Sequence, residues 1–129
     1  MRKLLIIFIL IFTSVPVIAK DGAEVLMGGY LLFRIRCGNN YLTAQQRADV
    51  IQERVNKLLS RDDFDCETML EIRKYGTDAV IYADGKVLVH VDKKLGELNG
   101  ESANNLAISW MKRVKELYPL ARPIFEQFR

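Results

Sequence analysis

The single histidine of this 129-residue chain stands two positions before an aspartate. His90 and Asp92 lie in a run of alternating apolar residues, so a strand would turn both side chains to the same face. A carboxylate that orients an imidazole is typical of a general base. The sequence places no serine or cysteine nucleophile beside them. Two interpretations therefore stand: the base of a small hydrolase, or a partly exposed strand histidine without a catalytic role.

A cluster of acidic side chains is the second candidate for chemistry. Residues 61–65 read Arg-Asp-Asp-Phe-Asp, and carboxylates gathered in a loop are typical Ca²⁺ ligands. The segment lacks the central glycine and terminal glutamate of the twelve-residue calcium loop. We therefore interpret it as a solvated loop, and we expect no metal and no cofactor.

Cys37 and Cys66 are the two cysteines of the chain. They are too far apart for a redox CxxC motif, and with one histidine they make a poor zinc set. A helix of about 24 Å is predicted between them. If that helix returns the chain so that the flanking strands run parallel, the sulfurs lie at opposite ends of the sheet. Another arrangement would allow a disulfide, so the bridge stays open.

The first nineteen residues have the layout of a secretory signal. Arg2 and Lys3 precede an unbroken apolar run, Leu4–Phe12, which is shorter than the ~20 residues that span a bilayer. We predict cleavage after Ala19 and a periplasmic domain over residues 20–118; an uncleaved anchor is the alternative. No later stretch is apolar enough for a transmembrane segment.

The net charge of the chain limits the class of partner. It is +3, and losing the two cations of the signal would leave +1. Proteins that neutralise a phosphate backbone need a strongly basic surface. We therefore expect no nucleic-acid partner.

Two segments near the start of the predicted domain have clear local signals. Residues 23–36 predict a hairpin around Gly28-Gly29, because glycine accepts the positive φ angles of a two-residue turn. Thr43 and Gln46 form a capping box that begins a helix. Polar residues such as Gln52 lie opposite the apolar stripe of this helix, which comprises Ala44, Ala48, Ile51, Val55, Leu58 and Leu59.

Three strands and a second helix are predicted to follow. Residues 67–75, 78–83 and 86–92 are separated by tight turns, so the strands form an antiparallel meander. Ser102 begins the second helix, whose apolar face includes Trp110 as a core residue rather than a ligand platform. The order of elements predicts a two-layer α+β domain, an antiparallel sheet with two helices on one face.

Two surfaces stay open to more than one interpretation. Tyr30, Arg34 and Arg36 are expected on the outer face of a strand, either as an anion site or as an ordinary charged surface. In the tail, residues 119–129, two prolines predict a break or kink between Tyr118 and Pro123. The apolar residues of the tail either fold back over the domain or form a docking strip for a partner; they are Leu120, Ile124, Phe125 and Phe128.

One resemblance goes beyond these patterns. The chain resembles the periplasmic N-terminal domain that precedes the membrane part of some small-conductance-type mechanosensitive channels. The likeness covers most of positions 24–118, and its most specific piece is the run Arg47-Ala48-x-x-Ile51-x-x-Arg54. The other matching stretches are residues 29–35, 43–55, 63–65, 89–92 and 103–117. The channels continue into transmembrane helices, for which this sequence has no candidate stretch, so the resemblance implies the role of a soluble module and not conduction.

We therefore expect an exported, non-enzymatic domain that docks onto a protein partner, with a membrane channel as the partner that the resemblance implies. An inhibitor or immunity-type protein is the alternative, and the loop at residues 93–100 would enter the cleft of its target enzyme. A small hydrolase using His90 and Asp92 is the third hypothesis.

Overall fold

The computed structural model describes residues 22–127; the signal segment predicted at 1–19 and the tail residue Phe128 lie outside the described residues. The described part is an α+β domain, which confirms the predicted fold class. Its elements in chain order are β1 (Ala23–Met27), β2 (Tyr30–Ile35), α3 (Ala44–Leu59), β3 (Leu70–Tyr75), β4 (Asp78–Ala83), β5 (Lys86–Val91), α4 (Lys93–Leu98) and α5 (Ala103–Glu126).

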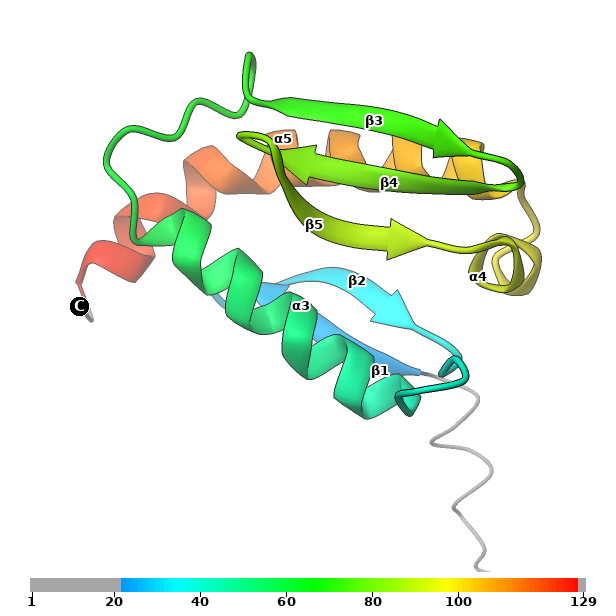
Figure 1. Ribbon diagram of the computed structural model, residues 1–129. Helices are drawn as coiled ribbons and strands as arrows, with labels where there is room; N and C mark the ends of the chain where they lie inside the picture. The colour runs from blue at the N-terminus through cyan, green and yellow to red at the C-terminus, as the bar shows by residue number, and fades with distance from the viewer. Residues whose placement is uncertain (1–21, 128–129) are drawn as a thin grey trace, which may run out of the picture.

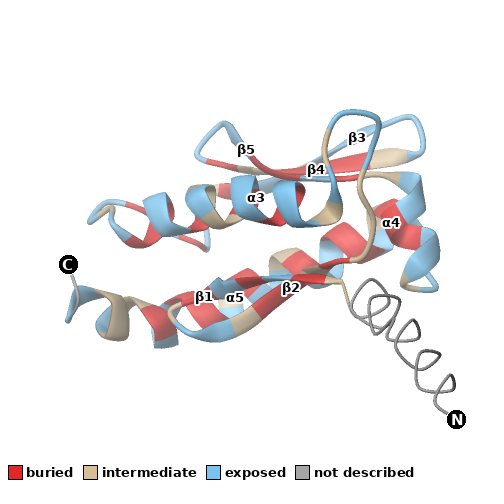
Figure 2. Cartoon of the chain, turned by 90° about the horizontal axis from the view of Figure 1, so that it is seen from below, coloured by how far each residue is buried: buried red, intermediate tan, exposed pale blue. Residues whose placement is uncertain are grey.

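The strands form two antiparallel sheets rather than one. The β1–β2 hairpin is one sheet, and the β3–β4–β5 meander is the other. Two layers result: the meander lies beside α3, and the hairpin lies beside α5 behind them (Figure 1; Figure 2 gives the view from below). α3 packs across the hairpin and α5 packs across the meander, so each sheet has its own main helix.

The capping box and the apolar stripe predicted for α3 are both confirmed. The Thr43 hydroxyl accepts a hydrogen bond from the Gln46 amide at 3.1 Å, and the Gln46 side chain accepts one from the Thr43 amide at 2.9 Å. The stripe residues are buried, with Ala44 partly so. The Gln52 amide, expected on the polar side, bonds both the N–H and the C=O of Leu26 at 2.7 Å. α3 is thereby attached to β1 by polar contacts as well as by its stripe.

The hairpin turn touches the C-terminal part of the chain. Gly28 and Gly29 have φ angles of +59° and +89°, the positive values that the turn requires. A Cβ added at Gly28 would lie 2.5 Å from the Cβ of Ala121, whereas one added at Gly29 would meet nothing within 4 Å. Gly28 therefore serves both the turn and the close approach of α5.

α5 continues without a break from Ala103 to Glu126, so of the break or kink predicted between Tyr118 and Pro123 the break is wrong. Each proline removes one backbone N–H and one hydrogen bond from the helix ladder. The helix persists because the residues between the prolines are packed: Tyr118 is 8% exposed and Ala121 is fully buried. The ribbon bends near its C-terminal end, which brings this end beside the end of α3 (Figure 1).

The core lies between the two layers. Phe33 of β2 stacks on Trp110 of α5 with ring centroids 4.4 Å apart, which confirms Trp110 as a core residue. The ring of Phe64, from the loop after α3, meets Tyr118 edge-on at 5.3 Å. Among residues 22–127, no helix is long and apolar enough to cross a membrane.

Candidate functional site

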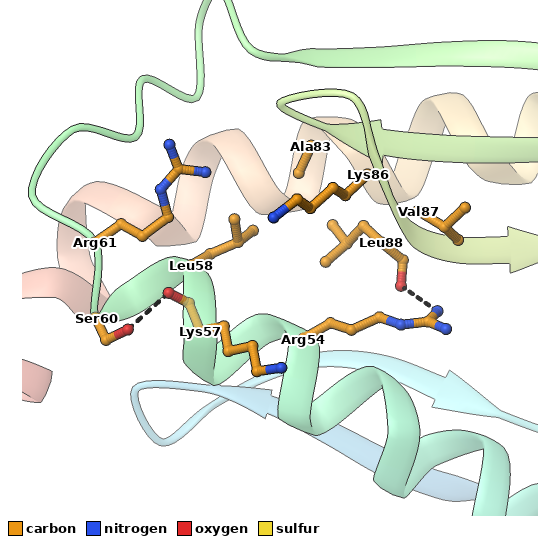
Figure 3. A pocket seen from close by; sticks show the side chains of 9 residues that line it. All are labelled: Arg54, Lys57, Leu58, Ser60, Arg61, Ala83, Lys86, Val87 and Leu88. Carbon is orange, nitrogen blue, oxygen red and sulfur yellow. Dashed lines mark hydrogen bonds between the residues drawn. The ribbon is translucent and has the colours of Figure 1, made fainter.

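A hollow of about 490 Å³ lies between the C-terminal half of α3 and the β4–β5 turn (Figure 3). We call it the basic groove, because four of its lining side chains are cationic. Its volume is within the range of small-molecule sites. The lining residues are Arg54, Lys57, Leu58, Ser60, Arg61, Ala83, Lys86, Val87 and Leu88.

The floor of the basic groove is apolar. Leu58, Ala83 and Leu88 are buried, with exposed fractions of 6%, 5% and 1%. Val87 remains 39% exposed at the rim, since a register shift between β4 and β5 leaves Leu88, and not Val87, turned inward. A ligand in the groove would meet Val87 as the most exposed aliphatic side chain of the lining, with positive charge at the edges.

Two of the cations have no carboxylate partner in the described structure. Neither Lys57 nor Lys86 makes an ion pair with any residue in 22–127. In Figure 3 Lys86 extends from the β4–β5 turn toward Leu58, while Lys57 and Arg54 extend from α3. Arg54 donates to the carbonyl oxygen of Leu88 at 3.2 Å, and burial lowers the pKa of its guanidinium. The two lysines are thus the cations most open to an external anion.

Arg61 is held by carboxylates of the protein itself. Its guanidinium pairs with Asp63 (Nε to Oδ1, 2.9 Å) and with Asp84 of the β4–β5 turn (Nη2 to Oδ2, 3.0 Å). The hydrogen bond that Arg61 donates to the Asp63 carboxylate raises the pKa of Arg61 and lowers the pKa of Asp63. These pairs connect the loop after α3 to the meander at one end of the groove.

The C-terminal part of α5 fixes this loop from the other side. Arg122 donates to the carbonyl oxygen of Arg61, to Asp62 (Nη2 to Oδ1, 2.6 Å) and to the hydroxyl of Tyr118 (3.2 Å). Its hydrogen bond with Glu126 raises the pKa of the guanidinium. The position of Arg61 beside the groove therefore depends on the tail helix.

Sequence reasoning did not identify the basic groove. Arg54 and Lys57 stand three positions apart on α3, a spacing that is a signal for one helix face, and Arg61 follows in the loop. Lys86 is 25 positions further on, and only the packing of α3 beside β5 brings it to the others.

The run from Arg47 to Arg54, the most specific piece of the resemblance, is explained by packing between α3 and β5. Arg47, only 6% exposed, donates to the carbonyl oxygens of Cys37 and His90 at 3.1 Å each. Arg54 binds the Leu88 carbonyl, while Ala48 and Ile51 are buried in the core. The two arginines satisfy main-chain acceptors along β5, which no further strand covers. The most specific piece of the resemblance thus has a structural role.

The predicted pair of His90 and Asp92 is not formed. The His90 Nε2 atom lies 3.0 Å from Oδ2 of Asp78, on the neighbouring strand. Asp92 follows the end of β5 and caps α4, accepting a hydrogen bond from the Leu95 amide at 2.9 Å; it also lies 3.4 Å from Arg47. The strand ends at Val91, so alternation no longer turns Asp92 to the face of His90.

The acidic loop does not gather its carboxylates. Asp62 pairs with Arg122 and Asp63 with Arg61, while Asp65 accepts from the Glu67 amide and the Thr68 hydroxyl. The hydrogen bond from the Glu67 amide lowers the pKa of Asp65 most, and the bond from the Thr68 hydroxyl lowers it further. Within the described ranges no three His, Cys, Asp or Glu side chains are grouped to hold a metal ion.

Cys37 and Cys66 are both free thiols in the structure. Cys37 precedes α3 and Cys66 follows it, and these two loops lie at opposite ends of the domain (Figure 1). The candidate disulfide is therefore absent. Burial raises the pKa of both thiols.

The other two predicted surfaces are the candidate anion site on β2 and the loop at 93–100. Tyr30 is exposed, Arg34 pairs with Glu24 at 3.4 Å, and Arg36 is partly buried. The expected inhibitor loop at 93–100 is mostly the short helix α4.

The tail is divided between core and surface. Leu120 is 54% exposed, whereas Phe125 is partly buried against the core. Ile124 and Phe125 border a second hollow of about 360 Å³ beside Gly28. Ala121 packs on the hairpin turn at Gly28. The described tail thus folds back over the domain and keeps some apolar surface exposed.

Residues 24–118 match a family model described as Domain of unknown function (DUF8459). The chain belongs to this family. No curated protein and no solved structure matches the chain. The matched segment includes every residue that lines the basic groove and also Arg47, whereas Arg122 lies beyond it.

Proposed function

We propose that this chain is an exported, non-enzymatic binding domain whose basic groove receives an anionic group. The observation that carries the proposal is the pair of lysines, Lys57 and Lys86, set over the buried floor of Leu58 and Leu88 without a carboxylate partner among the described residues. Cations beside low-dielectric surface attract an anion more strongly than cations surrounded by water.

The proposed setting is the periplasm, where the domain acts as an accessory or sensory module beside a membrane protein. The signal-like segment at 1–19 and the resemblance to the channel domain support this part of the proposal. The intact mass of the periplasmic chain tests the export step. We expect a mass that lacks the first nineteen residues; a full-length mass in the membrane fraction would contradict it.

The groove itself is tested by a photo-crosslinking residue at Val87, which stands exposed at the rim. We expect crosslinked adducts in intact cells that disappear when Lys57→Glu and Lys86→Glu are introduced together. Lys112→Glu, an exposed lysine of α5 outside the groove lining, is the matched control and should leave the adducts unchanged. Equal adduct yields in the charge-reversed and parent chains would refute docking at the groove.

A further inference from the structure

The ion pair between Arg61 and Asp84 crosses one end of the basic groove. Arg61 belongs to the loop after α3 and Asp84 to the β4–β5 turn, so the pair joins the two walls, with Nη2 and Oδ2 3.0 Å apart. The Asp84 side chain is 46% exposed. A carboxylate of the protein itself is therefore already seated on a cation that lines the groove.

We propose that the basic groove binds an amphiphilic carboxylate, a small molecule with one carboxylate and an apolar chain. Its carboxylate takes the place of Asp84 on Arg61, and its chain lies on Val87, beside the buried side chains of Leu58 and Leu88. This inference rests on the proposed function, which requires only that an anion binds in the groove.

Replacement of Asp84 by the ligand's carboxylate on Arg61 is favourable because of the position of Lys86. An incoming carboxylate on Arg61 also gains the ammonium of Lys86, which extends into the groove and has no ion pair among residues 22–127 (Figure 3). Asp84 loses little by release, since an exposed ion pair contributes little to stability and the freed carboxylate is hydrated.

The apolar residues that line the groove favour an amphiphilic ligand over a small inorganic anion. Val87, 39% exposed, is the aliphatic side chain most open to a ligand in the groove, while Leu58, Ala83 and Leu88 line it with little of their surface accessible. Each methylene group that covers such a surface adds to affinity, in proportion to the apolar area removed from water. A highly charged anion is disfavoured, because Asp63 and Asp84 hold negative charge at the same end.

Titration of the purified exported chain with three probes, followed by amide chemical shifts, tests the proposal. The probes are decanoate, which has both features, decanol, which lacks the charge, and acetate, which lacks the chain. We expect decanoate to bind at least about tenfold more tightly than either of the others, with shifts at Leu58 and Leu88.

Two substitutions should change the affinity for decanoate in opposite directions. Asp84→Asn removes the competing carboxylate and should tighten binding about threefold to tenfold. Asparagine tolerates the left-handed backbone of this position, φ +52°, so the turn is kept. Lys86→Met should weaken binding by a similar factor. Asp49→Asn, an exposed carboxylate of α3 outside the groove lining, is the control and should have no effect.

Each contrary result of these titrations would refute a different part of the proposal. Equal binding of decanoate and acetate, or of decanoate and decanol, would refute the amphiphile while leaving an anion site or an apolar site. Unchanged affinity in Asp84→Asn would refute the exchange on Arg61. If none of the probes binds and the crosslinks at Val87 persist after charge reversal, the proposed function fails together with this inference.

Discussion

The close approach of α5 to the hairpin turn gives the sharpest test of the tail, through the substitution Gly28→Ala. The new Cβ would lie 2.5 Å from the Cβ of Ala121 and 2.8 Å from its Cα, far inside van der Waals contact. Gly29→Ala is a matched control one residue away, where the φ angle is also positive but no atom lies within 4 Å. The difference between the two variants therefore measures the packing of the tail and not the turn.

The magnitudes follow from two separate costs. A non-glycine residue in the left-handed region costs about 1–2 kcal/mol, which both variants pay. Overpacking against Ala121 adds about 1–3 kcal/mol in Gly28→Ala alone. We therefore expect Gly28→Ala to melt roughly 5–20 °C below Gly29→Ala, measured by circular dichroism of the purified chain.

A double-mutant cycle identifies the contact. Ala121→Gly removes one of the clashing atoms, so it should recover part of the loss in Gly28→Ala and none of the loss in Gly29→Ala. Recovery stays partial because the Cα of residue 121 is still close. Equal melting temperatures for Gly28→Ala and Gly29→Ala would show that the tail does not rest on the hairpin turn, and the packing argument for α5 would be wrong.

Three further predictions concern the fold. Ile51→Asp should cost about 4 kcal/mol or more in unfolding free energy, because it buries an unpaired charge, whereas Val50→Asp on the exposed side should cost less than about 1 kcal/mol; urea titration of both variants checks the buried face. Arg47→Met should cost about 1–3 kcal/mol by the same measurement, since it leaves two part-buried carbonyl acceptors without their donor, and a change within error would refute its structural role. The lowered pKa values of Asp63 and Asp65 predict that stability is kept above about pH 4 and lost as the pH falls below it through their folded-state values. Asp65→Asn should show a smaller acid loss than the parent chain in urea titrations at two pH values.

Local structure was predictable because its causes are local. Thr43 and Gln46 stand three positions apart, and that spacing is sufficient to predict the capping box of α3. The turn at Gly28-Gly29 follows in the same way from the conformational freedom of glycine. The α+β class follows from the order of elements and their apolar periodicity.

Predictions failed where a distant partner, or the end of an element, decided the outcome. The tail helix continues through Pro119 and Pro123 because Tyr118 and Ala121 are buried against other elements, and this packing outweighs a local cost that the sequence shows plainly. Asp92 was paired with His90 by strand alternation, but the strand ends one residue earlier and the carboxylate caps α4 instead.

The sequence by itself determined α3, the start of α5 and the tight turns, since these depend on residues a few positions apart. Only the tertiary structure decided that α3 lies beside β5, and this one neighbour relation creates the basic groove. It brings Lys86 to Lys57 and turns Arg47 and Arg54 toward strand carbonyls, contacts that span 25 positions or more. Such contacts depend on how two surfaces pack together, and no spacing within either segment encodes that choice.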